Sequence, residues 1–308
     1  MVTDLNGGVT ADELAQSLAG SGVTISNVTF TGAPQAAGSF SGGNGIIGFS
    51  DGIILGSGSV SSVPGPNDED GVTTDFGGPG DADLDPLTGG FPTQDAAVLE
   101  FDFVPQGGSV SFLYVFTSDE YNEFVASEFN DVFAFFVNGT NCALVGSDPV
   151  SINTINNGNP FGVGPSSHPE LFINNDLEDG GGSIDTEMDG LTRVLTCTAT
   201  VNSGATNHMK LAIADVSDGI LDANVFIQAG SLSACEPQAE ICNGLDDDCD
   251  GVVDNGCTGA GGALIEGAGC SLRAGTSGSA GLTVGLLAMA SVFFAVRRAK
   301  SHSSNSGR

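Results

Sequence analysis

Short runs with an apolar residue at every second position are the feature that most constrains the fold of this chain. Residues 97–103 place Ala, Leu and two Phe side chains on one side of an extended strand, and residues 110–116 repeat this alternation. The runs 131–137, 210–215 and 224–232 are also largely apolar, and Gly, Asn and Asp residues separate the runs. This pattern predicts an all-β domain, an antiparallel β-sandwich of jelly-roll-like form.

One short helix is expected near the N-terminus, over residues 10–19. Thr10 and Glu13 have the spacing of a capping box, two leucines four residues apart share one helical face, and Gly20 can close the end. The chain contains 47 glycines without a regular period, which indicates many turns rather than a collagen-like repeat.

The charge of the chain excludes one class of partner. The sequence has 38 acidic and seven basic residues, a net charge of −31, and only Arg193 and Lys210 are basic before residue 266. Nucleic acid is not an expected partner, because phosphate binding requires a basic face. Most of the acidic side chains are interpreted as solvated surface. Such acidity fits an extracytoplasmic protein that works among divalent cations.

The seven cysteines fall into groups of two, four and one along the chain. Even groups predict disulfides, and disulfides require an oxidising compartment. We expect Cys142 to pair with Cys197, and the group of four to pair within itself. The cysteines expected in disulfides are Cys142, Cys197, Cys235, Cys242, Cys249 and Cys257. The odd cysteine, Cys270, is expected to serve sorting or lipid attachment.

The stretch CNGLDDDCDGVVDNGC, residues 242–257, has the spacing of a calcium loop. Calcium loops offer oxygens at positions 1, 3, 5, 7 and 9 and a glycine at position 6, where this stretch has Gly251. The predicted ligands are Asp246, Asp248, Asp250, the carbonyl of Val252, and Asp254, with Ca²⁺ as the cofactor. Position 12 is Cys257 rather than glutamate, so the loop is not an EF-hand.

An acidic disulfide loop without an ion is the alternative. Zinc fits less well, because the cysteines lack C-x₂-C spacing.

Three further acidic loops, at 80–85, 118–131 and 174–190, lie between expected strands. Loops of a sandwich gather at its two ends, so their carboxylates can converge on a second cation. The candidate ligands of this second site are Asp81, Asp83, Glu120, Asn130 and Asp131. The alternative is that these loops are solvated turns.

The C-terminal part predicts a membrane anchor. A Gly-rich linker at 258–279 contains Cys270, and residues 280–296 form a largely apolar segment of the minimum length for a spanning helix. Arg297 and Arg298 follow, which predicts that the tail 297–308 is cytoplasmic. A buried core helix is the alternative. The first residues have no apolar signal segment, so we expect a signal peptide upstream of this start.

Several stretches resemble known families of bacterial surface proteins. Residues 1–234 resemble a choice-of-anchor L domain through TDFGGPGDADLD, AAVLEFDFVP, TSDEYNEFVASEFNDVFAFFVNG and KLAIADVSDGILDANVFIQAGSL. Residues 235–257 resemble the metal-binding motif of MopE-type surface proteins, because residues 242–254 match its pattern C-N-G-x-D-D-D-C-D-G-x-x-D. The cysteine, apolar segment and arginines of the C-terminus resemble a MYXO-CTERM sorting segment. These resemblances imply a cell-surface protein that is attached to the membrane by its C-terminal segment and has no established activity.

The expected function is therefore a surface-anchored, calcium-binding, non-enzymatic protein for adhesion or interaction, whose partner is a surface protein or a glycan. A surface hydrolase of polysaccharides is one alternative, with Glu120 and Asp131 as paired carboxylates. A calcium-dependent lectin is another. No G-x-S-x-G or H-E-x-x-H motif is present, and the chain has only three histidines, which disfavours an enzyme.

Overall fold

The computed structural model describes residues 1–69 and 71–235 of the chain. The predicted calcium loop at 246–254 and the anchor at 280–296 lie outside the described residues, and so do the linker 258–279 and the tail 297–308. Cys242, Cys249, Cys257 and Cys270 lie outside as well. Within the described part, every helix is too short or too polar to span a bilayer.

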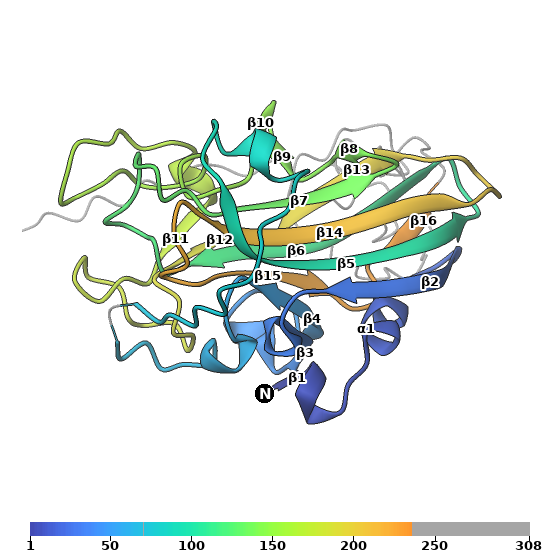
Figure 1. The fold of residues 1–308 in the computed structure, drawn as a ribbon, viewed down its shortest axis with the longest axis horizontal. Helices are drawn as coiled ribbons and strands as arrows, with labels where there is room; N and C mark the ends of the chain where they lie inside the picture. The colour runs from blue at the N-terminus through green and yellow to red at the C-terminus, as the bar shows by residue number, and fades with distance from the viewer. Residues whose placement is uncertain (70, 236–308) are drawn as a thin grey trace, which may run out of the picture. The chain divides into compact units, whose positions relative to one another are not determined.

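Two antiparallel sheets make up the described domain (Figure 1). The larger sheet has the order β1-β3-β4-β15-β6-β12-β11, and two more strands, β13 and β16, also pair with β6. Its strands are β1 (Val2–Asp4), β3 (Ala37–Ser41), β4 (Asp51–Gly56), β6 (Ser109–Ser118), β11 (Phe172–Asn174), β12 (Gly190–Thr192), β13 (Leu195–Thr200), β15 (Ala223–Gln228) and β16 (Ser233–Cys235).

The smaller sheet has five strands in the order β2-β5-β14-β7-β8. These are β2 (Val23–Thr31), β5 (Thr93–Pro105), β7 (Val132–Val137), β8 (Thr140–Asn141) and β14 (Asn207–Val216). A two-stranded ribbon joins β9 (Leu144–Val145) to β10 (Asp148–Pro149). Short 3₁₀ turns occupy Leu5–Gly7, Pro34–Ala36, Gly43–Gly45, Val60–Ser62, Asp85–Leu87 and Pro169–Leu171.

The single α-helix among residues 1–69 and 71–235, α1 (Ala11–Leu18), begins with the predicted capping box. The Thr10 side chain accepts from the Glu13 backbone N–H (3.2 Å), and Glu13 accepts from the Thr10 N–H (2.8 Å). The helix ends one residue earlier than predicted, because Ala19 and Gly20 leave it to pair with Leu232; the Gly20 N–H donates to the Leu232 carbonyl (2.9 Å).

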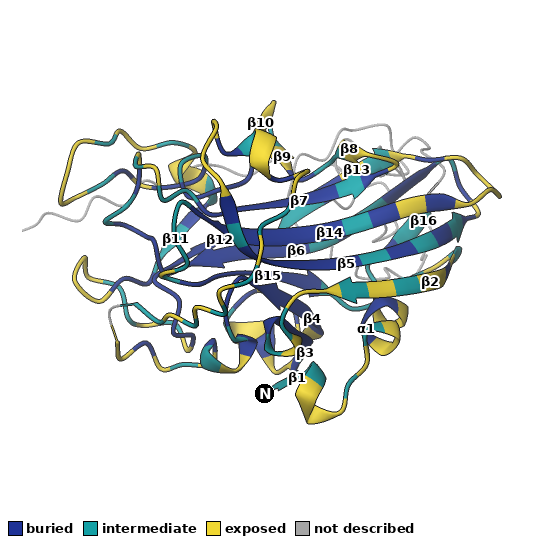
Figure 2. Ribbon diagram, in the orientation of Figure 1, coloured by how far each residue is buried: buried dark blue, intermediate teal, exposed yellow. Residues whose placement is uncertain are grey.

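The main core lies between the two sheets, and aromatic side chains fill it. Rings of β6 meet rings of β7, with centroids 4.9 Å apart for Phe112 and Phe135 and 5.3 Å for Tyr114 and Phe133. These separations are typical of favourable aromatic pairs. Figure 2 shows the central strands buried and the loops exposed. The predicted all-β antiparallel fold with one short helix is confirmed.

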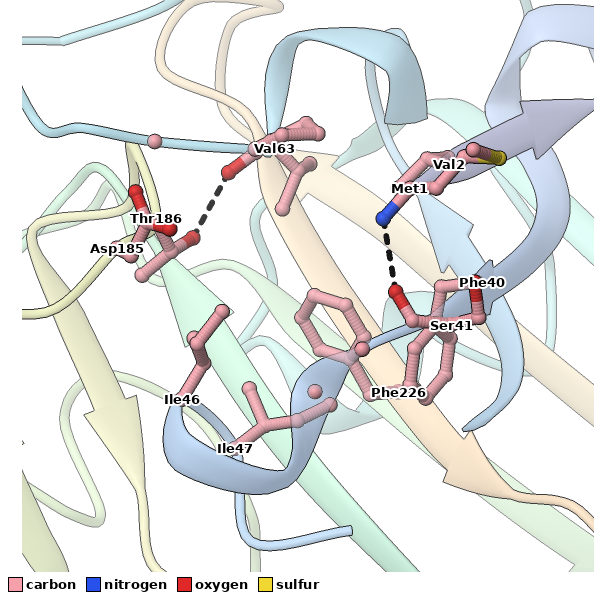
Figure 3. A pocket seen from close by; sticks show the side chains of 14 residues that line it. Met1, Val2, Phe40, Ser41, Ile46, Ile47, Val63, Asp185, Thr186 and Phe226 are labelled. Atoms are coloured by element: carbon pink, nitrogen blue, oxygen red, sulfur yellow. Dashed lines mark hydrogen bonds between the residues drawn. The ribbon is translucent and has the colours of Figure 1, made fainter. Parts of the chain in front are cut away.

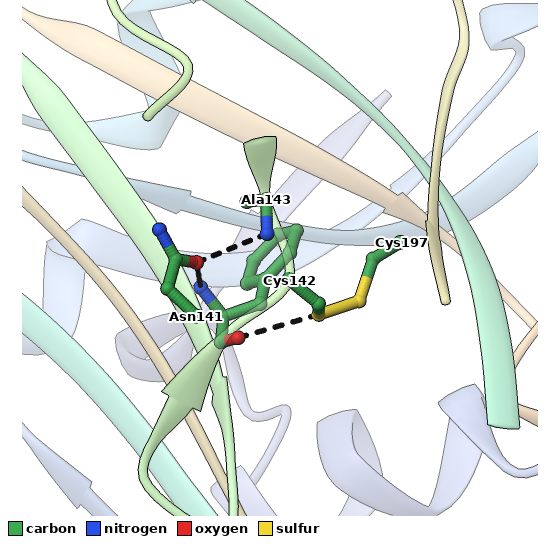
Figure 4. The surroundings of a disulfide bond; sticks show 5 residues. Asn141, Cys142, Ala143 and Cys197 are labelled. Carbon is green, nitrogen blue, oxygen red and sulfur yellow. Dashed lines mark hydrogen bonds between the residues drawn. A yellow bond between two sulfur atoms is a disulfide. The ribbon is translucent and has the colours of Figure 1, made fainter. Parts of the chain in front are cut away.

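A disulfide joins the two sheets (Figure 4). Cys142 follows β8 of the smaller sheet, and Cys197 lies in β13 of the larger one, with Cα atoms 5.2 Å apart. The backbone keeps both partners in register, because Cys142 N–H donates to the Phe135 carbonyl (2.9 Å) and Cys197 pairs with Phe112. The predicted Cys142–Cys197 pairing is therefore confirmed.

Candidate metal centre

Strand ends of both sheets meet at one end of the sandwich, where long loops gather (Figure 1). The pairing register establishes this. In the larger sheet, Ser118 at the end of β6 pairs with Ala223 at the start of β15. In the smaller sheet, Ala214 near the end of β14 pairs with Val132 at the start of β7, and β5 also begins at this end, opposite the end of β14.

Several acidic residues at this end are almost completely buried, among them six with 1% to 4% of their surface exposed. Carboxylates are seldom buried to this degree unless they are paired, because removing a charge from water is costly. The six come from the strand boundaries just described. They are Asp95, Asp119, Glu120, Asp131, Asp215 and Asp222, and we call them the carboxylate cluster.

Asp131, directly before β7, and Asp215 of β14 continue the pairing of these two strands by one position. Ala214 pairs with Val132, so the next position of each strand is Asp215 and Asp131. Like charges in facing positions of an antiparallel pair repel. Asp131 is held by hydrogen bonds from the Val216 N–H (3.1 Å) and the Ser118 hydroxyl (3.5 Å).

Neither carboxylate oxygen of Asp215 accepts a hydrogen bond, although both are buried. The hydroxyl of Ser57 lies close enough to lower the pKa of Asp215, against the rise that burial causes. The same hydroxyl lies 3.4 Å from the carbonyl of Ala223, and its single proton cannot serve both acceptors fully. Glu120 Oε2 and Asp222 Oδ2 are buried without a partner in the same way. A buried oxygen without a donor costs about 1–3 kcal/mol or more when charged, so these oxygens require a proton, a water molecule or a cation as a partner.

Burial makes Glu120, Asp131 and Asp215 hold protons when no cation is present. Burial and the charges of Asp218 and Asp215 raise the pKa of Glu120 to about 9. Burial raises the pKa of Asp131 well above its usual range, and the neighbouring Glu120 adds to the shift. Burial and the facing Asp131 raise the pKa of Asp215 in the same way. A proton or a metal ion must therefore neutralise these groups.

Basic side chains do not neutralise these facing carboxylates. Among the described residues, the sequence has Arg193 and Lys210 as its only Arg and Lys. Lys210 Nζ contacts Asp81 (2.8 Å) and Asp83 (2.6 Å), away from the cluster. Arg193 Nε donates to the backbone carbonyl of Glu170 (2.8 Å).

The cluster also holds an extended segment, residues 72–78, by its backbone. Alternate N–H groups of this segment point to buried carboxylates. The donor–acceptor pairs are Val72 N to Asp119 Oδ2 (3.0 Å), Thr74 N to Asp222 Oδ1 (2.8 Å), Phe76 N to Asp95 Oδ2 (2.8 Å) and Gly78 N to Asp95 Oδ1. The cluster therefore fixes a surface loop as well as the strand ends.

The five residues predicted to form a second cation site do not lie together in the structure. Glu120 and Asp131 lie in the cluster, whereas Asp81 and Asp83 surround Lys210. Asn130 Oδ1 accepts from the Asn153 N–H (2.9 Å). Sequence reasoning missed the roles of Asp215 and Asp222. Both stand at the boundary of an apolar strand, which is the local signal that could have found them.

A preformed metal site made of charged or sulfur ligands is not present: in residues 1–69 and 71–235, no three His, Cys, Asp or Glu side chains form a group that could hold a metal as they stand. Metal binding by the cluster would require its side chains to turn toward one another.

Two cavities of the described residues lie away from Glu120 and Asp131, although Asp95 of the cluster lines one of them. A cavity of about 190 Å³ is lined mainly by apolar side chains, including Phe40, Ile47, Val63 and Phe226 (Figure 3). A second, of about 330 Å³, borders Phe76 and the start of β5. Neither is lined by Glu120 or Asp131, the pair considered for hydrolysis.

The two described histidines contact acidic side chains at the surface. His168 Nδ1 lies 3.2 Å from Glu170. His208 lies between Asp102 (3.0 Å) and Glu100 (3.3 Å), and the hydrogen bond with Asp102 raises the pKa of His208. Both contacts lie at exposed positions, and the raised pKa of His208 favours its protonated form over a general base.

Comparison with known proteins gives one match. The model of the choice-of-anchor L domain family matches residues 3–233. No curated protein and no solved structure matches the chain. The match covers most of the sequence and nearly the whole described domain, so the chain belongs to the choice-of-anchor L domain family.

Proposed function

We propose that this protein is a non-enzymatic, calcium-binding domain of the cell surface, which acts in adhesion to a surface protein or a glycan. Membership of the choice-of-anchor L family implies the surface location. The calcium assignment is carried by one observation: Asp215 is buried at the carboxylate cluster with neither oxygen hydrogen-bonded.

Calcium is the cation that best fits the chemistry of the cluster. Ca²⁺ takes six to eight oxygen ligands in flexible geometry, and hard carboxylate oxygens favour it over zinc or copper. The proposed ligands are Asp215, Asp131 and Glu120, with Asp222 adjacent. The pKa of Asp222 is raised to about 6, mainly by burial. Calcium would replace the protons on these groups and draw the side chains together.

The interaction surface is proposed to be the loops at this end. Phe161, Val163, Leu177 and Ile220 are exposed on loops that follow β10, β11 and β14. The loop with Phe161 and Val163 is tied to the segment after β6, because Asn159 Nδ2 donates to the Glu123 carbonyl (2.6 Å). Exposed apolar side chains on a rigid base are typical of binding surfaces, and calcium would supply the rigidity.

Thermal unfolding of the full chain with chelator and with saturating Ca²⁺ tests the calcium assignment. Saturation about 100-fold above Kd stabilises by about 2.7 kcal/mol, which corresponds to a rise in Tm of roughly 5–10 °C. Asp131→Asn with Asp215→Asn should abolish most of this rise. Asp148→Asn, an exposed carboxylate of β10, is the matched control and should keep it. An equal rise in both variants would contradict a calcium ion at the cluster.

Adhesion and hydrolysis give opposite results in a second experiment. The chain should bind cells or glycans in a calcium-dependent manner and release no fragments from labelled polysaccharides. Release of fragments that disappears in Glu120→Gln would show the hydrolase instead.

A further inference from the structure

We propose a second calcium site, separate from the carboxylate cluster, formed by side-chain oxygens of Asn122, Asn174, Asp176 and Asp179. It joins the segment that follows β6 to the loop that follows β11. The residues differ from those of the first centre, so either site can exist without the other.

The amide nitrogen of Asn122 lies among three acceptors. Its Nδ2 is 2.9 Å from Asn174 Oδ1, 3.1 Å from Asp176 Oδ2 and 3.2 Å from Asp179 Oδ2. A side-chain amide has two protons to donate, so it can satisfy at most two of the three. Two of these acceptors are carboxylates, and one neutral amide cannot balance their negative charge.

The other end of the same amide gives an independent indication. Asn122 is 1% exposed, and its Oδ1 has no hydrogen-bond partner. The oxygen and nitrogen of an amide have nearly the same shape, so their positions are assigned from the surrounding hydrogen bonds. Turning the amide over aims this unpartnered oxygen at the three acceptors. Four oxygens then converge with no proton donor between them, which is the environment of a cation.

The distances fit calcium. Ligands about 2.3–2.6 Å from Ca²⁺ lie roughly 2.9–3.4 Å from their neighbours in the coordination shell. The separations of 2.9, 3.1 and 3.2 Å around Asn122 fall in this range and are also ordinary N–H···O distances, so the unpartnered Oδ1 of Asn122 carries the assignment. Mg²⁺ has shorter bonds and a stricter octahedral geometry, so its neighbouring ligands lie closer together.

The surrounding backbone orients the buried ligand. Asp176 is fully buried, and its Oδ1 accepts from the N–H groups of Glu178 (2.6 Å) and Asp179 (3.1 Å). Its Oδ2 is thereby directed to the proposed ion. Asp179 is exposed, so the ion can enter from solvent and complete its shell with water.

Replacing Asn122 with aspartate, which has the same shape, distinguishes the two interpretations of this group of side chains. If Asn122 donates protons, Asn122→Asp places three carboxylates together and destabilises the domain whether or not Ca²⁺ is present. If a cation is bound, Asn122→Asp adds a charged ligand, and the affinity for Ca²⁺ rises by about tenfold or more. The first result would overturn the proposal, and the second supports it.

Native mass spectrometry and calcium titration of the full chain count the ions. Asp176→Asn with Asp179→Asn should bind one Ca²⁺ fewer than Glu178→Gln, the matched control in the same loop. Should the double variant not fold, Asp179→Asn alone, at an exposed position, should weaken one binding step by about tenfold. The carboxylate cluster is tested separately: Asp215→Asn should lose a different Ca²⁺ ion. A folded Asp176→Asn/Asp179→Asn chain with unchanged stoichiometry and affinity would refute the second site.

Discussion

The backbone N–H of Val216 donates to Oδ1 of Asp131 (3.1 Å), across the ends of β14 and β7. This bond fixes Asp131 beside Asp215, the residue before Val216, whose own carboxylate has no donor. One aspartate of the facing pair is therefore held in place, and the other requires a proton or a cation. The state of this pair should control how the domain responds to pH.

Without calcium, the domain should lose stability as the pH rises. Burial, reinforced by Asp218 and Asp215, raises the pKa of Glu120 from 4.5 to about 9, and burial raises that of Asp222 to about 6. Between the unfolded and folded pKa values, the folded chain binds more protons, so the free energy of unfolding falls with pH. Tm measured in chelator between about pH 5 and pH 9 should decline, and saturating Ca²⁺ should reduce the slope. A Tm in chelator that increases across this range would be inconsistent with proton-loaded carboxyl groups.

Removing the disulfide should lower stability substantially. The Cys142–Cys197 bond closes a loop with a sequence separation of 55. The chain-entropy model assigns about 4 kcal/mol to a loop of this length. Urea unfolding of Cys142→Ala/Cys197→Ala should show this loss relative to Cys270→Ser, a control that removes a cysteine outside the described residues. A midpoint equal to that of the control would show that the two sheets do not depend on the bond.

Lys210 should matter more for stability than the other described basic residue. Its Nζ binds both oxygens of Asp81 (2.8 Å each) and one of Asp83 (2.6 Å), with 12% of the side chain exposed. Lys210→Met leaves these carboxylates without their counter-ion, for an expected loss of about 1.5–3 kcal/mol in urea unfolding. Arg193→Gln, at an exposed position, should change stability by no more than about 0.5 kcal/mol. Equal losses of stability in both variants would show that the ion pairs of Lys210 with Asp81 and Asp83 do not stabilise the domain.

The sequence was informative where the structural cause is local. Alternation with a period of two was enough to predict β5 and β6, because one side of each strand faces the core between the sheets. The capping box predicted the start of α1 for the same reason, since Thr10 and Glu13 contact each other within one turn. Grouping along the sequence also sufficed for the disulfide, because Cys142 and Cys197 stand apart from the group of cysteines that begins at Cys235.

The site was predicted only in part, because its geometry depends on distant pairings. Glu120 and Asp131 were recognisable as acids beside an apolar strand. That Asp215 faces Asp131 depends on the register of β14 against β7, which no local pattern fixes. Asp81 was expected near these residues, but Lys210, 129 positions away in the sequence, binds it instead.

The buried Asp95 should determine whether the segment 72–78 stays docked. Its two oxygens accept the N–H groups of Phe76 (2.8 Å) and Gly78, whereas the exposed Asp75 accepts only within its own turn, from Gly77 (2.7 Å). Each lost acceptor leaves a donor unsatisfied at a cost of about 1–3 kcal/mol, which corresponds to roughly 10- to 100-fold faster amide exchange. Hydrogen–deuterium exchange of this segment should therefore accelerate in Asp95→Ala and remain near the wild-type rate in Asp75→Ala. Because Asp119 and Asp222 hold the same segment, Ca²⁺ should slow its exchange in the wild-type chain. If neither Asp95→Ala nor Ca²⁺ changes the exchange rate of residues 72–78, the carboxylate cluster does not hold this segment in place.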